Sequence, residues 1–125
     1  MNVVVSVNPE NEYLFIKVSG IITNQVEHRL LTERFYLEIK EHGSNNTIID
    51  VSETSFPHSF EFLNDIVEFY SEELPDEVKY WKIAVVDESS YRELGKYCEF
   101  IANQQGFMGY KVFSSMKEAQ ASIND

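Results

Sequence analysis

The chain has 125 residues, of which ten are basic and twenty-one acidic, so its formal net charge is −11. A charge of this size repels phosphate backbones and anionic lipid headgroups, which argues against nucleic acid or a bare membrane surface as partner. Hydrophobic residues make up 43% of the chain, which argues against intrinsic disorder. We therefore expect a single folded domain over residues 1–125 with one core.

The N-terminal sequence and the cysteine content indicate a cytoplasmic protein. The first residues show no basic segment followed by a sustained apolar stretch, and no apolar run approaches the roughly 20 residues of a membrane-spanning helix. The single cysteine, Cys98, has no partner for an internal disulfide, which fits a reducing compartment. We expect no membrane span, and we expect Cys98 to be a small buried hydrophobe.

The N-terminal residues predict a β-hairpin. Residues 3–7 and 13–18 are rich in β-branched and aromatic side chains, and the turn-forming residues 8–11 lie between them. A helix should follow from about residue 25 to residue 41. Asn24 and Glu27 have the spacing of a capping box at its start, and Gly43 should end it.

The rest of the chain alternates between strand and helix signals. Strands are expected at residues 47–51, 81–86 and 110–113, and helices at about residues 58–73, after Ser90, and from Ser115 to about Ile123. Strands that are joined through helices should be parallel, because the crossovers are right-handed. The fold class is therefore α/β, with a mixed, mostly parallel sheet of about five strands, an antiparallel N-terminal hairpin, and about four helices packed on the sheet.

The first helix carries two apolar stripes. One stripe consists of Leu31, Phe35 and Ile39, and it can face the sheet. The second stripe has three members: Val26, Leu30 and Leu37. It has two interpretations, packing on a neighbouring helix of the same chain or forming a homodimer, since exposed apolar patches often mark interfaces.

The second helix has an acidic face opposite a broad apolar one, and this pattern also has two interpretations. A surface helix packed on a sheet shows such a division as a rule. The width of the aromatic arc also allows it to line a ligand cavity or a partner groove.

No constellation of residues predicts catalysis. The histidines at positions 28, 42 and 58 lack the spacing of a metal motif, and the glycines form no phosphate-binding loop. Cys98 has no nearby cation beyond Lys96 to lower its pKa, so we do not expect it to be a nucleophile. The sequence therefore predicts a protein that is not an enzyme and that has neither a metal site nor a cofactor.

Four segments together resemble the SpoIIAA-like branch of the STAS superfamily. Residues 15–22 are similar to its second strand and the following glycine, and residues 48–53 to its central strand. Residues 82–86 and 110–119 are similar to its last strands and closing helix, including the Val-Phe-x-x-x-x-Glu-Ala pattern. The resemblance implies an anti-sigma-factor-antagonist fold, which is related to SEC14-like lipid carriers.

Phosphorylatable members of that superfamily carry Asp-Ser-Ser-Gly at a helix start after the central strand. Ser59 matches the first serine, but His58, Phe60 and Glu61 replace the other three residues. This departure puts recognition by a kinase in doubt. A serine at this place also fits a helix cap, so phosphorylation and capping remain as alternatives for Ser59.

Two functional hypotheses follow. The first is a non-catalytic STAS-like regulatory module that binds another protein, whose contact residues are Ser52, Ser55, His58 and Ser59. The alternative is a module that binds an apolar ligand or lipid through aromatic side chains: Phe56, Phe60, Phe62, Phe69, Tyr70 and Trp81. The same family resemblance motivates both hypotheses, and kinship of fold is only an analogy for function.

Overall fold

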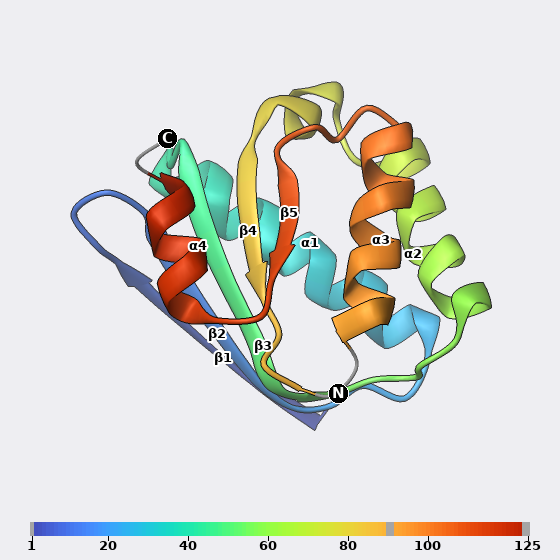
Figure 1. The fold of residues 1–125 in the computed structure, drawn as a ribbon. Helices are drawn as coiled ribbons and strands as arrows, with labels where there is room; N and C mark the ends of the chain where they lie inside the picture. Colours follow the sequence, from blue (N-terminus) through green and yellow to red (C-terminus); the bar gives the residue numbers. More distant parts are fainter. Residues whose placement is uncertain (1, 90–91, 124–125) are drawn as a thin grey trace.

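A computed structural model describes residues 2–89 and 92–123 and shows a five-stranded sheet in the order β1-β2-β3-β4-β5 (Figure 1). The strands are β1 (Asn2–Pro9), β2 (Leu14–Ile21), β3 (Asn46–Ser55), β4 (Lys82–Val86) and β5 (Tyr110–Phe113). β1 is antiparallel to β2, and the other neighbouring strands are parallel. The predicted α/β class, with an antiparallel N-terminal hairpin on a mostly parallel sheet, is confirmed.

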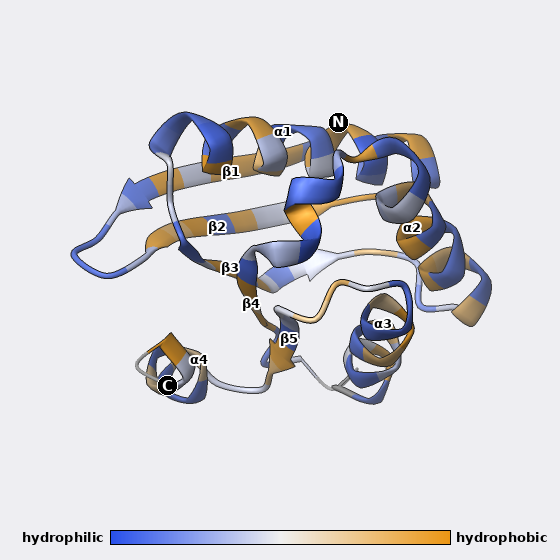
Figure 2. Cartoon of the chain, turned by 90° about the horizontal axis from the view of Figure 1, so that it is seen from above, coloured by the Kyte–Doolittle hydropathy of each residue, from blue (hydrophilic) through white to orange (hydrophobic). Residues whose placement is uncertain are grey.

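The helices are α1 (Gln25–His42), α2 (Phe60–Glu73), α3 (Arg92–Gln104) and α4 (Met116–Ile123). A short 3-10 helix, η1 (Asp76–Tyr80), follows α2 and was not predicted. The connections from β2 through to β5 all step across the sheet in one direction, so right-handed crossovers place α1, α2 and α3 on one face. The other face receives α4 (Figures 1 and 2).

Local hydrogen bonds explain where α1 begins and ends. The Asn24 side chain accepts a hydrogen bond from the backbone N–H of Glu27, as predicted. The Glu27 carboxylate accepts from the backbone N–H of Thr23 at 2.7 Å, one residue earlier than in a standard capping box. Gly43 ends the helix in the left-handed conformation, with φ of 61°, which a side chain would disfavour.

Serine side chains cap two further helices. The Ser59 hydroxyl accepts a hydrogen bond from the backbone N–H of Phe62 at 3.1 Å, so α2 begins two residues later than the expected start at residue 58. The Ser115 hydroxyl accepts from the backbone N–H of Glu118 in the same way. The cap predicted at Ser90 lies outside the described residues.

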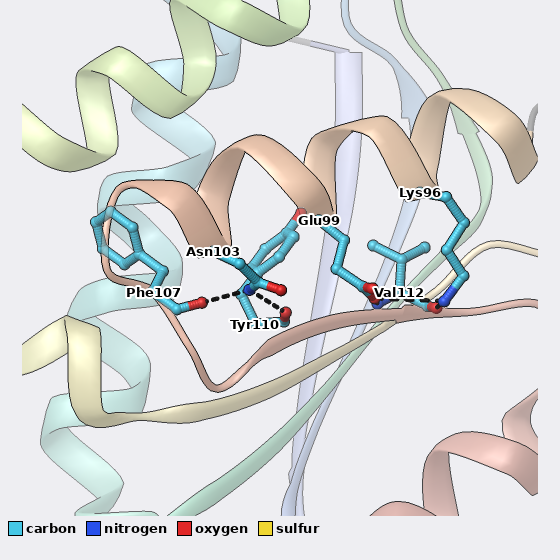
Figure 3. Close-up of polar contacts among 6 residues, drawn as sticks. All are labelled: Lys96, Glu99, Asn103, Phe107, Tyr110 and Val112. Carbon is cyan, nitrogen blue, oxygen red and sulfur yellow. Dashed lines mark hydrogen bonds and ion pairs between the residues drawn. The ribbon is translucent and has the colours of Figure 1, made fainter.

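Side chains of α3 cover the free edge of the sheet at β5 (Figure 3). The Glu99 carboxylate accepts a hydrogen bond from the backbone N–H of Val112 at 2.6 Å, and the Lys96 ammonium donates to the Val112 carbonyl. The Asn103 amide donates to the carbonyl of Tyr110. These contacts satisfy backbone groups that an edge strand otherwise leaves open, and they hold α3 firmly against β5.

Candidate functional site

A cavity of about 130 Å³ lies between the sheet and the helices α1, α2 and α3. Most of its walls are apolar side chains, and the strands supply one side: Ile49, Val51, Ile83, Val85 and Val112. The helices and loops supply the opposite side with larger groups, among them Leu31, Phe35, Tyr36, Phe56, Leu63, Ile66, Tyr70, Leu94, Trp81 and Phe107. The cavity therefore occupies the middle of the larger layer of the core.

An aromatic pair forms one wall of the cavity. The ring of Tyr36, from α1, stacks on that of Trp81 with centroids 5.5 Å apart and planes 17° from parallel. Natural cores contain few voids larger than a water molecule. A hollow of about 130 Å³ beside this pair is therefore larger than a core usually contains, and it needs an explanation.

Two tyrosines and the cysteine bring polar atoms to the cavity. The hydroxyl of Tyr110 lies 3.6 Å from the sulfur of Cys98, and the rings of Tyr70 and Tyr110 have centroids 6.3 Å apart. Burial raises the pKa of both tyrosines above the ordinary range. Burial also raises the pKa of the Cys98 thiol to about 11. All three groups are therefore uncharged near neutral pH, and too little of Cys98 is present as thiolate for it to be a good nucleophile.

His28 and Thr32 extend this polar cluster along α1. The Thr32 hydroxyl lies 3.3 Å from Nδ1 of His28, and the His28 ring meets that of Phe62 edge to face. Burial lowers the pKa of His28 to about 4, against the opposing effect of the Asp65 carboxylate. The imidazole is thus neutral at physiological pH and adds no charge to the cavity wall.

Asp87 is the one carboxylate among the described residues that line the cavity. It is buried, and it follows directly after β4. Its side chain accepts a hydrogen bond from the backbone N–H of Ser89 at 2.9 Å. The carboxylate thereby organises the turn after the strand.

The loop predicted to bind a partner lies at the carboxyl ends of the parallel strands. Ser55, His58 and Ser59 are exposed there, whereas Ser52 is partly buried and accepts a hydrogen bond from the backbone N–H of Glu88. Ser52 thus joins β3 to the turn after β4. Phe56 lines the cavity, and the centroid of its ring lies 4.8 Å from that of the exposed His58. The loop therefore connects the cavity wall to the surface.

The aromatic residues predicted to bind a ligand are distributed over three environments. Phe56 and Trp81 line the cavity. Phe62 and Phe69 are buried but do not line the cavity, and Phe60 is 59% exposed. The broad arc of α2 therefore serves both as core and as surface, and only part of the predicted set meets at one place.

Sequence reasoning missed Tyr110 and Thr32 as cavity residues. Tyr110 alternates with Val112 on the short strand β5, so a period of two already placed both on one face of the sheet. Thr32 follows Leu31 on the buried side of α1, and both are buried. A hydroxyl on an otherwise apolar face is the signal that identifies such positions.

Neither a cluster of metal ligands nor a membrane-spanning helix occurs among the described residues. Across residues 2–89 and 92–123, no group of three or more histidine, cysteine, aspartate or glutamate side chains is arranged to hold a metal ion. In the same part of the chain, no helix has the length and apolar character needed to cross a membrane.

Comparison with known proteins identifies the fold. No protein-family model and no curated protein matches the sequence. An anti-sigma factor antagonist from Mycobacterium paratuberculosis has a similar crystal structure, with a TM-score of 0.66 and 17% identity over 98% of this chain and 95% of that one. An uncharacterised protein with a SpoIIAA-like fold from Shewanella loihica PV-4 is also similar, with a TM-score of 0.56 and 18% identity over 98% and 93% of the two chains. The chain therefore has a SpoIIAA-like fold, as its sequence predicted.

Proposed function

We propose that this chain is a non-catalytic regulatory module that binds another protein through the loop of residues 55–59 and the start of α2. The observation that carries the proposal is a mixed polar and apolar surface at that place. Ser55, His58 and Ser59 are exposed, and they lie between two exposed apolar side chains, Ile21 at 53% and Phe60 at 59%. Ile21 is the register partner of Ser55 in the sheet.

This surface has the composition and rigidity of a recognition site. Interfaces combine apolar anchors, often aromatic, with a polar rim that supplies hydrogen bonds. The backbone is held on both sides, because the Ser55 carbonyl accepts from the N–H of Ile22 at 2.8 Å and Ser59 caps α2. A loop fixed in advance loses little entropy on binding. The resemblance to an anti-sigma factor antagonist supports the same class of function.

A comparative capture experiment tests the proposal. The immobilised protein is exposed to an extract of its own source cells in three forms: unchanged, with His58→Ala and Phe60→Ala together, and with Met108→Ala. Met108 is 66% exposed in the loop before β5 and serves as the matched control. We expect one protein to be recovered by the unchanged and control forms and at least tenfold less by the double variant. Equal recovery by all three forms would refute this surface.

The lipid-binding alternative receives less support from the cavity. Sites for drug-sized ligands have volumes of roughly 300 Å³ or more, and a lipid chain needs more still. The cavity of about 130 Å³ is well below that size. We therefore do not propose a lipid carrier.

Self-association is a second proposal, and it rests on α1. Val26, Leu30 and Leu37 are 65%, 52% and 63% exposed, so their stripe does not pack on a neighbouring helix of the chain. Large apolar side chains gathered on one helix face commonly mark an interface. We propose that a second copy of this chain covers the stripe.

The order of side chains along α1 fits an antiparallel pairing with its own copy. A two-fold axis between Glu33 and Arg34 places Leu30 opposite Leu37 of the second copy. The same axis places Glu33 opposite the other Arg34, so both charges meet a partner of opposite sign. Glu33 and Arg34 are both exposed in the single chain. The central part of the helix is therefore complementary to itself, with leucine opposite leucine and each charge opposite its counterpart.

Sedimentation of charge variants tests the pairing. Arg34→Glu should shift the chain toward monomer, because the new glutamate then faces Glu33 of the second copy, and the same repulsion occurs on both sides of the axis. The double change Glu33→Arg with Arg34→Glu should restore the dimer, since it only exchanges the two charges. Leu30→Glu should also give monomer, whereas Val4→Glu, at a similarly exposed position on β1, should not. A mass that is the same for all variants would exclude this interface.

A further inference from the structure

We propose that the cavity under α1, α2 and α3 binds a small uncharged molecule that consists of one aromatic ring or a short hydrocarbon chain with a single hydroxyl or carbonyl group. This site lies beneath the exposed loop, which contributes Phe56 to its wall, and it would serve a function beyond partner binding. Three observations on the cavity carry the proposal: its size, its hydroxyl groups and the lack of charge on most of its wall.

The size of the cavity sets the size of the ligand. Its volume is about 130 Å³, and its walls are mainly aliphatic and aromatic. An apolar cavity of roughly 150 Å³ is large enough to hold benzene or xenon, and such a cavity stays dry when empty. A molecule of about one ring therefore fits, and it gains favourable contacts with side chains such as Ile49, Val85 and Phe107.

The hydroxyl groups determine which end of a ligand is recognised. The Tyr110 hydroxyl has the Cys98 sulfur at 3.6 Å as its side-chain partner among the described residues. A thiol is a weak donor and a weak acceptor, so this hydroxyl gains from an oxygen partner. Tyr70 has its ring beside that of Tyr110 and also lines the cavity. A hydroxyl or carbonyl oxygen on the ligand would form the stronger hydrogen bond that the thiol does not provide.

The electrostatic character of the wall selects against charged ligands. The two tyrosines, Cys98 and His28 are all uncharged near neutral pH, and no lysine or arginine is among the described lining residues. Asp87 is the single carboxylate there, and a negative group repels an anionic ligand. An anion would lose its hydration without gaining a partner of opposite charge, which is costly.

Methyl NMR spectroscopy of the full chain tests the proposal with three probes: benzene, phenol and benzoate. The structure provides matched reporters, because Ile49 and Val85 line the cavity while their neighbours Ile48 and Val86 face α4. We expect benzene and phenol to shift the methyl resonances of Ile49 and Val85 until the site is saturated. The methyl resonances of Ile48 and Val86 should not change. Phenol should bind about fivefold more tightly than benzene, the factor that one net hydrogen bond gives. Benzoate should produce no saturable shift.

Conservative variants distinguish recognition from simple filling of space. Tyr110→Phe should remove the preference for phenol over benzene and leave benzene binding intact. Tyr13→Phe is the control, because the Tyr13 hydroxyl pairs with Gln120 near α4. A folded protein in which neither benzene nor phenol shifts Ile49 or Val85 would overturn the site. Equal shifts at all four methyl reporters would show non-specific binding and would also overturn it. Binding of benzoate as tight as that of phenol would refute the proposed ligand class.

Discussion

The two faces of the sheet are packed in different ways. On one face, α4 approaches closely because Ala119, which is fully buried, presents only a methyl group to Ile48, Ala84 and Val86. On the other face, α1, α2 and α3 carry large side chains such as Tyr36 toward the sheet, and a cavity of about 130 Å³ remains. Small residues therefore close a helix–sheet layer, whereas large rings that meet one another can leave space between them.

Because of this difference in packing, we expect the two faces to have different roles in stability and binding. Around Ala119 the α4 face is closely packed, so we expect Ile48 and Val86 to respond to mutation as core residues do. A more polar hollow of about 180 Å³ lies beside the end of α4, where Lys82, Lys111 and Ile123 are among its lining residues. The face under α1, α2 and α3 combines the cavity with neutral polar groups, and its rim includes the loop at Phe56. The three proposed binding sites, namely the cavity, the exposed loop and the apolar stripe of α1, all belong to elements of this second face.

The largest expected effect is a loss of stability in acid that arises from His28 on the cavity face. Burial holds the pKa of His28 at about 4 in the folded chain, against 6.5 for an exposed histidine. Between these values the unfolded chain binds more protons than the folded one, so stability falls as pH decreases from 6.5 to 4. The full loss is about 3 kcal/mol at 1.36 kcal/mol per pH unit.

Denaturant unfolding at several pH values measures this effect. His28→Gln should flatten the pH dependence between pH 6.5 and pH 4. His42→Gln is the control, because His42 is an exposed histidine on the same helix. If the slope is unchanged in the His28 variant, burial of this imidazole does not control acid stability.

A matched pair of substitutions on β4 tests the comparison itself. Val86 is fully buried against the α4 face, so Val86→Leu should overpack it and cost about 1–3 kcal/mol of unfolding free energy. Val85 lines the cavity, so Val85→Leu should be neutral or stabilise the chain by up to about 1 kcal/mol. Thermal and urea unfolding measure both changes. Equal costs at the two positions would mean that the faces are equally dense.

A smaller effect is expected where an ion pair joins two helices of the cavity face. Arg29 on α1 donates to both carboxylate oxygens of Asp65 on α2, at 3.0 and 3.1 Å. Asp65→Asn should cost about 1 kcal/mol, because the pair is partly exposed and screened by solvent. The Asp65 carboxylate raises the pKa of His28, so its removal should lower that pKa further. NMR titration of the His28 ring is the measurement, and an upward shift would contradict the assignment.

The order of elements was predictable from sequence because the signals are local. Asn24, Gly43 and Ser59 each act through hydrogen bonds or backbone angles within a few residues, so their spacing already indicates where helices begin and end. The shift of the Glu27 contact from Asn24 to Thr23 depends on the exact direction of the chain, which spacing alone does not determine.

The cavity was not predictable, because it depends on the distance between layers. Phe62 and Phe69 share one side of α2 and are buried, whereas Phe60, about half a turn away, is exposed, so the helical period already separates them. The period does not indicate that Phe62 and Phe69 are buried without lining the cavity. Tyr70 and Tyr110 are forty residues apart and meet only because α2 and β5 pack on the same side. Periodicity predicts which face a residue occupies, but not whether the facing side chains fill the space.

A crystal structure of the protein under xenon pressure tests the central claim most directly. Xenon enters dry apolar cavities and scatters strongly, so its position reveals them without any assumption about the natural ligand. The account predicts a xenon atom between Tyr70, Val85 and Tyr110, and none in the closely packed layer between Ala119 and Val86. Xenon absent from the first place, or ordered water filling it, would contradict a dry binding cavity on this face.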